Sequence, residues 1–131
     1  IEFINTVIDF YGQFGKVRKS ADVFGCIPAH KKDIVSTNAM LTSYISNQQY
    51  DEVIVLFDQT PSALRDDISN VLFLKACIGA HDYYQQGAQV INNIISARNA
   101  HFHQHSSELI SAIIDFYAHY GALQEAENIY H

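Results

Sequence analysis

The chain has 131 residues, enough for one ordinary domain or a short stack of repeats, and 48% of them are hydrophobic against 17% charged. This composition excludes intrinsic disorder, and no apolar run is long enough to predict a membrane-spanning helix. The formal net charge of −6 argues against a protein that holds nucleic acid mainly through its phosphates. The charge does not exclude a protein that recognises exposed bases through side-chain hydrogen bonds.

The first 33 residues predict two helices. Apolar residues recur there at three- and four-residue steps, first at Ile4, Val7, Ile8 and Tyr11 and then at Val17, Ala21 and Phe24. Gly15 lies where the first helix must stop, because glycine adopts the left-handed conformation at a helix end at little cost. Pro28 prevents continuation of the second helix. The same pattern returns in residues 34–66, where Pro61 takes the place of Pro28.

The chain repeats itself. The segment Ile8-Asp9-Phe10-Tyr11 returns unchanged 106 residues later, and an offset of 33 places Asn5 on Asn38. We divide the chain into repeats 1–33, 34–66, 67–106 and a truncated 107–131, with an insertion at 97–104. No stretch alternates apolar and polar residues as a strand would. The predicted fold is all-α, a right-handed α-solenoid of helix-turn-helix hairpins in one domain, 1–131.

The two ends and the cysteines carry smaller predictions. The chain begins at Ile1 and stops inside a helical pattern at His131, so we expect a segment of a longer protein. Helix faces left exposed at both ends predict self-association of the isolated piece. Cys26 and Cys77 are too few for a disulfide-stapled secreted scaffold, and we expect both to be buried thiols in a reducing compartment.

The eighth residue of each repeat is bulky. Tetratricopeptide repeats carry a small residue there, whereas this chain has Ile8, Leu41, Leu74 and Ile114. The pattern instead resembles pentatricopeptide repeats, the RNA-binding repeats abundant in organelles. Residues 5–11 followed by Gly15, residues 33–40 and residues 74–77 resemble first helices of such repeats.

The unequal repeat lengths resemble the long and short variants found in organellar RNA-editing factors. Gln48 and His81 depart from the family pattern, in which Gly is usual at these positions. The resemblance implies a mitochondrial or other organellar protein of RNA processing or C-to-U editing, which binds single-stranded RNA with one base per repeat.

The resemblance also implies base-reading residues. In the family the fifth and the last residue of a repeat act together, and Asn followed by Asp favours uridine and then cytidine. Carried over to this chain, Asn5 pairs with Asp33 and Asn38 pairs with Asp66. An amide suits this task because it offers both a donor and an acceptor.

The later repeats match this pattern less well. The third repeat has Val71 at the reading position and Ser106 at its end, so we expect it to act as a spacer. The fourth has Ser111, which in the family suits a purine. Val35 and Ile68 match the position whose side chain stacks between neighbouring bases.

Other interpretations stay open for these residues. Asn5 and Asn38, like Asp33 and Asp66, are also common helix N-caps. The alternative function is a protein–protein scaffold like that of tetratricopeptide proteins, which the acidic net charge favours. A third interpretation is a spacer or a dimerisation segment. Fifth-position residues that line the inner face favour RNA reading, whereas buried caps favour a scaffold.

The sequence predicts neither a metal site nor catalysis. His101, His103 and His105 alternate, but no cysteine or further carboxylate accompanies them, so we expect a solvated loop without a metal. The zinc-deaminase signature and glycine-rich phosphate loops are missing. We therefore expect no enzyme and no cofactor; any deaminase activity would lie in a domain outside this chain.

Overall fold

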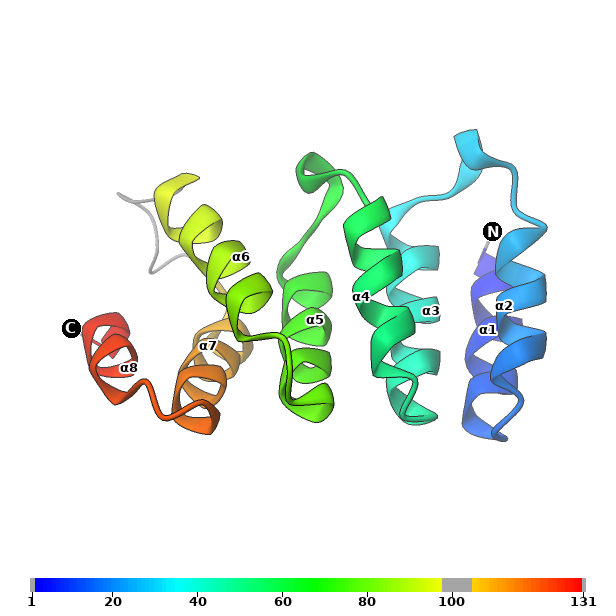
Figure 1. Ribbon diagram of the computed structural model, residues 1–131. Coiled ribbons are helices and arrows are strands. Elements are labelled where there is room, and N and C mark those ends of the chain that lie inside the picture. Colours follow the sequence, from blue (N-terminus) through cyan, green and yellow to red (C-terminus); the bar gives the residue numbers. More distant parts are fainter. Residues whose placement is uncertain (1, 98–104, 131) are drawn as a thin grey trace.

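The chain folds into a row of helical hairpins (Figure 1). A computed structural model describes residues 2–97 and 105–130, and within them it contains eight α-helices, two 3-10 helices and no strand. The hairpin helices are α1 (Glu2–Gln13), α2 (Val17–Gly25), α3 (Ile34–Ser46), α4 (Tyr50–Gln59), α5 (Asp67–Ala80), α6 (Tyr84–Ala97), α7 (Ser107–His119) and α8 (Leu123–Tyr130). The 3-10 helices η1 (Ala29–Lys31) and η2 (Ser62–Leu64) precede α3 and α5. The all-α prediction is confirmed.

The first helices of the hairpins form one layer. Helix α1 packs on α3, α3 on α5, and α5 on α7, while each second helix packs on the first helix of its own hairpin. Helices α2 and α4 also contact the first helix of the next hairpin. The hairpins therefore stack as a solenoid, and grooves form between neighbouring first helices.

Acidic residues and serines start the first helices. The Asp33 carboxylate accepts a hydrogen bond from the Ser36 backbone N–H at 2.9 Å, and Asp66 accepts from Ser69 N–H at 2.9 Å. In both pairs the serine hydroxyl accepts a bond from the backbone N–H of the aspartate, which completes a capping box. Helices α3 and α5 thus begin at the first residues of the expected second and third repeats.

The turns inside the four hairpins share one backbone conformation. Gly15 and Gly121 have φ of 75° and 74°, and Gln48 and His81 have φ of 59° and 71° at the same repeat position. Glycine adopts this left-handed region freely, whereas another residue loses roughly 1 kcal/mol there. The left-handed backbone explains why glycine is usual at this position in the family. Gln48 and His81 adopt the same turn at a cost in conformational free energy.

The bulky eighth residues form the centre of the stack. Ile8, Leu41 and Leu74 are fully buried, and Ile114 is half-buried. Large rings join the hairpins around them, as in Phe57 and Phe73, whose ring centroids lie 4.2 Å apart.

The two cysteines differ. Cys77 is buried, and burial raises the pKa of its thiol to about 12. Cys26 is exposed, so the expectation of two buried thiols is wrong for it. The reason is local: Cys26 is the C-cap of α2, and the next residue, Ile27, takes the buried position with 3% exposure.

Within the described ranges, no helix has the length and apolar character needed to cross a lipid bilayer.

Candidate nucleic-acid interface

A groove runs between α1 and α3 and holds both predicted reading amides. Its volume is about 440 Å³, and its walls include Asn5, Asp9, Val35, Asn38 and Ser43. Asn5 and Asn38 lie inside α1 and α3 rather than at their ends. The N-cap interpretation of these two asparagines is therefore wrong, because both helices begin at least three residues earlier.

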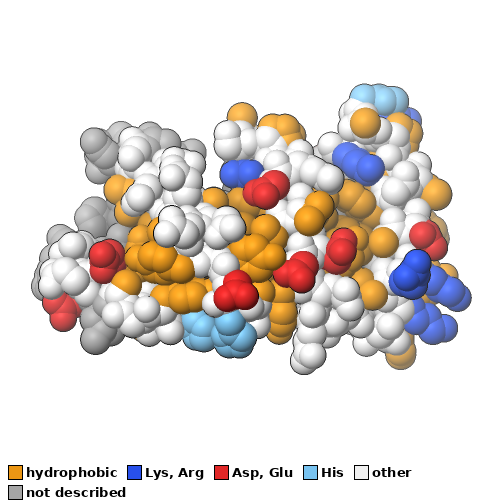
Figure 2. Space-filling model, in the orientation of Figure 1, with side chains coloured by type: hydrophobic (Ala, Val, Ile, Leu, Met, Phe, Trp, Pro, Cys, Tyr) orange, Lys and Arg blue, Asp and Glu red, His pale blue; other side chains and the backbone are white. Residues whose placement is uncertain are grey.

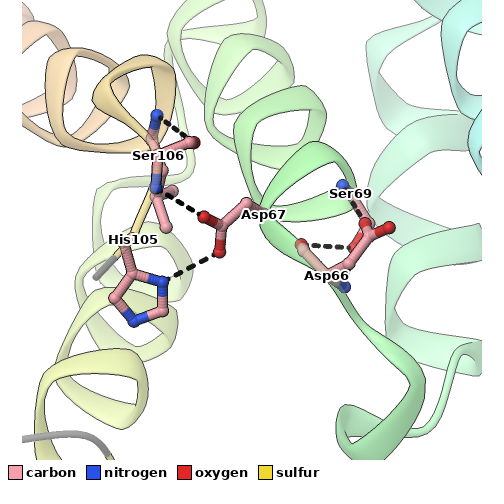
Figure 3. Close-up of polar contacts among 6 residues, drawn as sticks. Asp66, Asp67, Ser69, His105 and Ser106 are labelled. Carbon is pink, nitrogen blue, oxygen red and sulfur yellow. Dashed lines mark hydrogen bonds and ion pairs between the residues drawn. The ribbon is translucent and has the colours of Figure 1, made fainter. Parts of the chain in front are cut away.

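Asn38 meets Asp66 across the hairpin boundary. Its Nδ2 donates to the Asp66 carboxylate, at 3.2 Å from Oδ1 and 3.4 Å from Oδ2. Asp66 also caps α5 through Ser69, and Figure 3 shows this contact at the start of the helix. The cap interpretation is thus correct for Asp66, and the same carboxylate orients the Asn38 amide.

The first pair is arranged differently. Asp33 caps α3 and is exposed, which again supports the cap interpretation. Asn5 is 9% exposed, and no hydrogen bond joins it to Asp33 in the described parts of the chain. The structure therefore joins Asn38 and Asp66 by a hydrogen bond, and within the described residues it shows no such bond between Asn5 and Asp33.

Three polar atoms of residues that line the α1–α3 groove have no hydrogen-bond partner within the described ranges. They are Asn5 Oδ1, Asn38 Oδ1 and Ser43 Oγ, and all three are buried. An unsatisfied buried polar group costs about 1–3 kcal/mol. A ligand that brings hydrogen-bonding groups into this groove can recover part of that cost.

The α1 and α3 backbones approach closely at one end of this groove. A Cβ atom on Gly12 would lie 2.5 Å from Ser43 Oγ and 3.1 Å from its Cα. Asn47 Nδ2 donates to the Gly12 carbonyl oxygen at 3.1 Å, which ties the two helices together. The small residue fixes the spacing of α1 and α3.

A second groove of about 450 Å³ lies between α5 and α7. Val71, Lys75, Ser111 and Asp115 are on its walls. Val71 is half-buried and Ser111 is exposed, so this groove presents a hydroxyl where the α1–α3 groove presents two amides. All four fifth-position residues thus border grooves between first helices.

The two predicted stacking residues are open to solvent. Val35 is 59% and Ile68 is 60% exposed, although both are apolar. Val35 lies on the wall of the α1–α3 groove, near Asn38 in the sequence. A flat apolar ligand surface can therefore contact Val35 without displacing other side chains.

The charges are distributed unevenly. Lys16, Arg18, Lys19, Lys31 and Lys32 supply five of the eight basic residues. On the face shown in Figure 2, Lys and Arg gather mainly at the end that holds α2. Among its described lining residues, the α1–α3 groove has no Lys or Arg. Instead it has Asp9, and burial raises the pKa of that carboxyl. This groove is suited to uncharged polar groups rather than to phosphates.

Sequence reasoning missed a contact that two repeats share. Arg65 lies 3.9 Å above the Phe57 ring, and Lys32 Nζ lies 4.7 Å above the Phe24 ring. Each cation follows its aromatic partner by eight residues in the sequence. This shared spacing could have predicted the contact. Both contacts attach the connection between hairpins to the second helix before it.

The histidine prediction is wrong for His105. Its side chain is only 10% exposed, and Nδ1 lies 2.8 Å from Asp67 Oδ1. Asp67 Oδ2 accepts the Ser106 backbone N–H at 2.7 Å, and Ser106 caps α7 (Figure 3). His101 and His103 lie outside the described residues. No three His, Cys, Asp or Glu side chains of the described chain are grouped to hold a metal ion.

Comparison with known proteins points to one family. The family model described as PPR repeat matches residues 4–30 and 35–61. A pentatricopeptide repeat-containing protein of Arabidopsis thaliana is 26% identical over 128 residues, covering 96% of this chain and 20% of the relative. Another from Arabidopsis thaliana is 30% identical over 131 residues, covering 95% and 18%.

A third relative is a mitochondrial pentatricopeptide repeat-containing protein of Oryza sativa subsp. japonica. It is 25% identical over 128 residues, covering 96% of this chain and 20% of the relative. The chain therefore spans about a fifth of the length of these relatives.

Proposed function

We propose, from the premise that this chain belongs to the pentatricopeptide repeat family, that it binds single-stranded RNA along the grooves between its first helices. Proteins of this family are generally RNA-binding proteins of organelles. The proposal assigns one base to each repeat that carries a polar fifth residue. Asn5 and Asn38 then read bases in the first and second repeats, and Ser111 does so in the fourth.

The observation that carries this proposal is the Asn38–Asp66 contact at the α1–α3 groove. One N–H of the Asn38 amide is held by Asp66, which leaves a second N–H and the unpartnered Oδ1 for a ligand. Splayed-out RNA bases present donors and acceptors on their Watson–Crick edges. An amide whose orientation is fixed can pair with such an edge, and exposed Val35 can contact the face of the ring.

The proposed preference is for two adjacent pyrimidines. It follows the family pairing of Asn with Asp in the first two repeats, at Asn5 with Asp33 and Asn38 with Asp66. A well-made base contact discriminates by about 1–3 kcal/mol in the analogous DNA case. Two such contacts give weak binding, and Val71 adds none because it has no hydrogen-bonding side chain.

The site of action is proposed as an organelle. Several relatives are named as mitochondrial or chloroplastic proteins. The unequal spacing of the repeats supports a role in RNA processing or editing, in which this chain selects the RNA. Any deamination would then belong to a domain outside residues 1–131, and the chain itself acts without a cofactor.

Titration with labelled RNA tests the proposal. Oligo-U and oligo-A of equal length are added to the chain at low salt, and fluorescence anisotropy follows binding. We expect tighter binding of oligo-U, and tighter binding of oligo-A contradicts the base assignment. The pair Asn38→Thr with Asp66→Asn should shift preference toward adenine. Asn92→Thr, at an exposed residue of α6, is the matched control and should change neither affinity.

A peptide-binding scaffold is the second candidate. The net charge of −6 and the lack of Lys or Arg among the described residues of the α1–α3 groove favour a basic peptide over a polyanion. Adding a lysine-rich peptide to the RNA titration separates the two functions. Saturable peptide binding that Asn38→Leu abolishes, together with no RNA binding, would assign the groove to a peptide.

A further inference from the structure

The third hairpin contains a cavity with both polar and apolar walls that is separate from both grooves. We call it the α5–α6 cavity; it has a volume of about 690 Å³ and is lined by Arg65, Asp67, Asn70, Val90, Ile94 and His105, among others. Helix α6 leans away from α5 toward its own C-terminus, which opens the hairpin at this end (Figure 1). The volume falls within the range of about 300–1,000 Å³ that small-molecule sites occupy.

The second hairpin has a smaller cavity at the equivalent position, and the comparison shows which lining residues differ between the two. That cavity measures about 280 Å³, and its walls include Ile34 and Thr37. The offset of 33 residues places Asp67 on Ile34 and Asn70 on Thr37. Burying polar groups costs free energy unless they are paired, so packing alone does not explain the exchange of Ile34 for Asp67. Asp67 is paired with His105 and Ser106, whereas Asn70 replaces the smaller polar side chain of Thr37 with an amide.

Two polar groups at this cavity lack partners. Asn70 is 8% exposed, and its side-chain amide makes no hydrogen bond within residues 2–97 and 105–130. The Arg65 Nε–H is buried without a partner in the same ranges, while Nη2 donates to the Phe57 carbonyl oxygen at 2.9 Å. The Asn70 amide is therefore available to a ligand, whereas Arg65 Nε is buried beside the Phe57 ring and Arg65 borders the cavity with the rest of its side chain.

The charges and walls of the α5–α6 cavity limit what can bind. Among the described lining residues, the carboxylates of Asp66 and Asp67 stand against one guanidinium, that of Arg65, so these residues disfavour an anionic ligand. Both carboxylates already accept hydrogen bonds from Ser69, Ser106 or His105 (Figure 3). Val90 and Ile94 add apolar surface. The cavity thus favours an uncharged flat ring with a polar edge.

We propose that the α5–α6 cavity binds a heteroaromatic ring that carries an N–H group between two carbonyl groups, as uracil does. The Asn70 amide pairs with the N–H and one carbonyl, and the Arg65 guanidinium at the cavity wall faces the other carbonyl. Val90 and Ile94, one turn apart on α6, contact one face of the ring.

The ring has two sources: a free nucleoside or a uridine of bound RNA. The second source rests on the proposed RNA binding, because Asp66 contacts both Asn38 of the groove and this cavity.

Titration of the whole chain with uridine tests the site. Nitrogen-15 NMR follows the side-chain amide of Asn70, and we expect saturable shifts with a dissociation constant of about 1 mM, as befits so small a ligand. N3-methyluridine, which lacks the N–H, should bind about tenfold more weakly. No saturation at about 20 mM, twentyfold above the expected constant, or equal binding of the methylated nucleoside overturns the inference.

Leucine variants locate the ligand. Asn70→Leu should abolish uridine binding in the cavity, whereas Asn92→Leu, at an exposed residue of α6 that lines neither the groove nor the cavity, is the matched control and should leave it unchanged. Binding lost in Asn38→Leu and kept in Asn70→Leu would place uridine in the groove and overturn the inference. If circular dichroism shows that Asn70→Leu does not fold, Asn70→Thr replaces it, because threonine is the residue of the second hairpin.

Oligo-U binding distinguishes the two sources. A drop of about tenfold in oligo-U affinity on Asn70→Leu supports the site and assigns the ring to the RNA strand. Unchanged oligo-U affinity with lost uridine binding supports it as a site for a free nucleoside. If wild-type chain binds uridine but no oligo-U, the α5–α6 cavity stands and the proposed RNA binding fails.

Discussion

Asp67 is expected to hold the third and fourth hairpins together, so replacing it should destabilise the chain. Its carboxylate accepts the Ser106 backbone N–H at 2.7 Å and a bond from His105 Nδ1 at 2.8 Å. Hydrogen bonds to a charged group are worth about 1.5–3 kcal/mol each, and solvent reduces this value at a side chain that is 31% exposed. We expect Asp67→Ala to lower the free energy of unfolding by about 2 kcal/mol.

Asp67→Asn should cost about half as much, because the amide oxygen can still accept the Ser106 N–H. Urea unfolding followed by circular dichroism measures both changes. Asp115→Asn, an exposed carboxylate on α7, is the matched control and should stay within about 0.5 kcal/mol of wild type. If Asp67→Ala changes stability no more than this control does, the link between the hairpins carries no energy and the reasoning is refuted.

The pH dependence gives a second check on Asp67. Burial alone would raise the pKa of this carboxyl, but hydrogen bonds from Ser106 and His105 outweigh it and hold the pKa below 3.8. A carboxyl with a lowered pKa stabilises the fold above its unfolded pKa and loses this effect as the pH falls through the folded pKa. The stability gap between wild type and Asp67→Asn should therefore be constant near neutral pH and shrink below about pH 3.8.

Two further predictions concern backbone geometry. Gln48→Gly should raise the free energy of unfolding by about 0.5–1 kcal/mol in the same urea assay, because Gln48 has a left-handed φ of 59°; a loss of stability would contradict this. Gly12→Ala should lower it by about 1–3 kcal/mol, because the new Cβ would meet Ser43 at 2.5 Å and force α1 from α3. Gly25→Ala is its control, since no atom lies within 4 Å of that Cβ, and equal effects of the two would refute the clash.

Local signals were enough to predict the stack of hairpins. The helix starts at Ile34 and Asp67 follow from an aspartate cap and an apolar pattern that recur after 33 residues. The turn at residue 81 has the same left-handed backbone as Gly15, although it is a histidine. Each of these features depends on neighbours within a few residues, so one sequence contains the information.

Contacts between distant residues were beyond the same reasoning. His105 was expected in a solvated loop because its partner, Asp67, precedes it by 38 residues. The pairs Asn5–Asp33 and Asn38–Asp66 have the same residues and spacing, yet among the described residues only the second pair is hydrogen-bonded. Side chains that meet across hairpins depend on how the hairpins tilt, and the repeat pattern does not specify that tilt.

Asp66 joins the stability of the fold to the proposed reading of bases, so variants must separate the two. Asp66→Ala removes the cap of α5 and the contact with Asn38, and should lower the free energy of unfolding by about 1 kcal/mol and abolish any oligo-U preference. Asp66→Asn keeps a good N-cap and changes only the group that faces Asn38.

Asn38→Ala leaves the Asp66 cap of α5 in place. It should therefore remove the oligo-U preference without the loss of stability that follows from removing the cap. Urea unfolding and RNA titration of the three variants then give independent answers. An Asp66→Asn chain as unstable as Asp66→Ala would show that α5 needs the charge of Asp66 itself, because its N-terminal dipole favours a carboxylate over an amide. Asp66 would then be explained by folding alone, and the case for base reading would have to rest on Asn38.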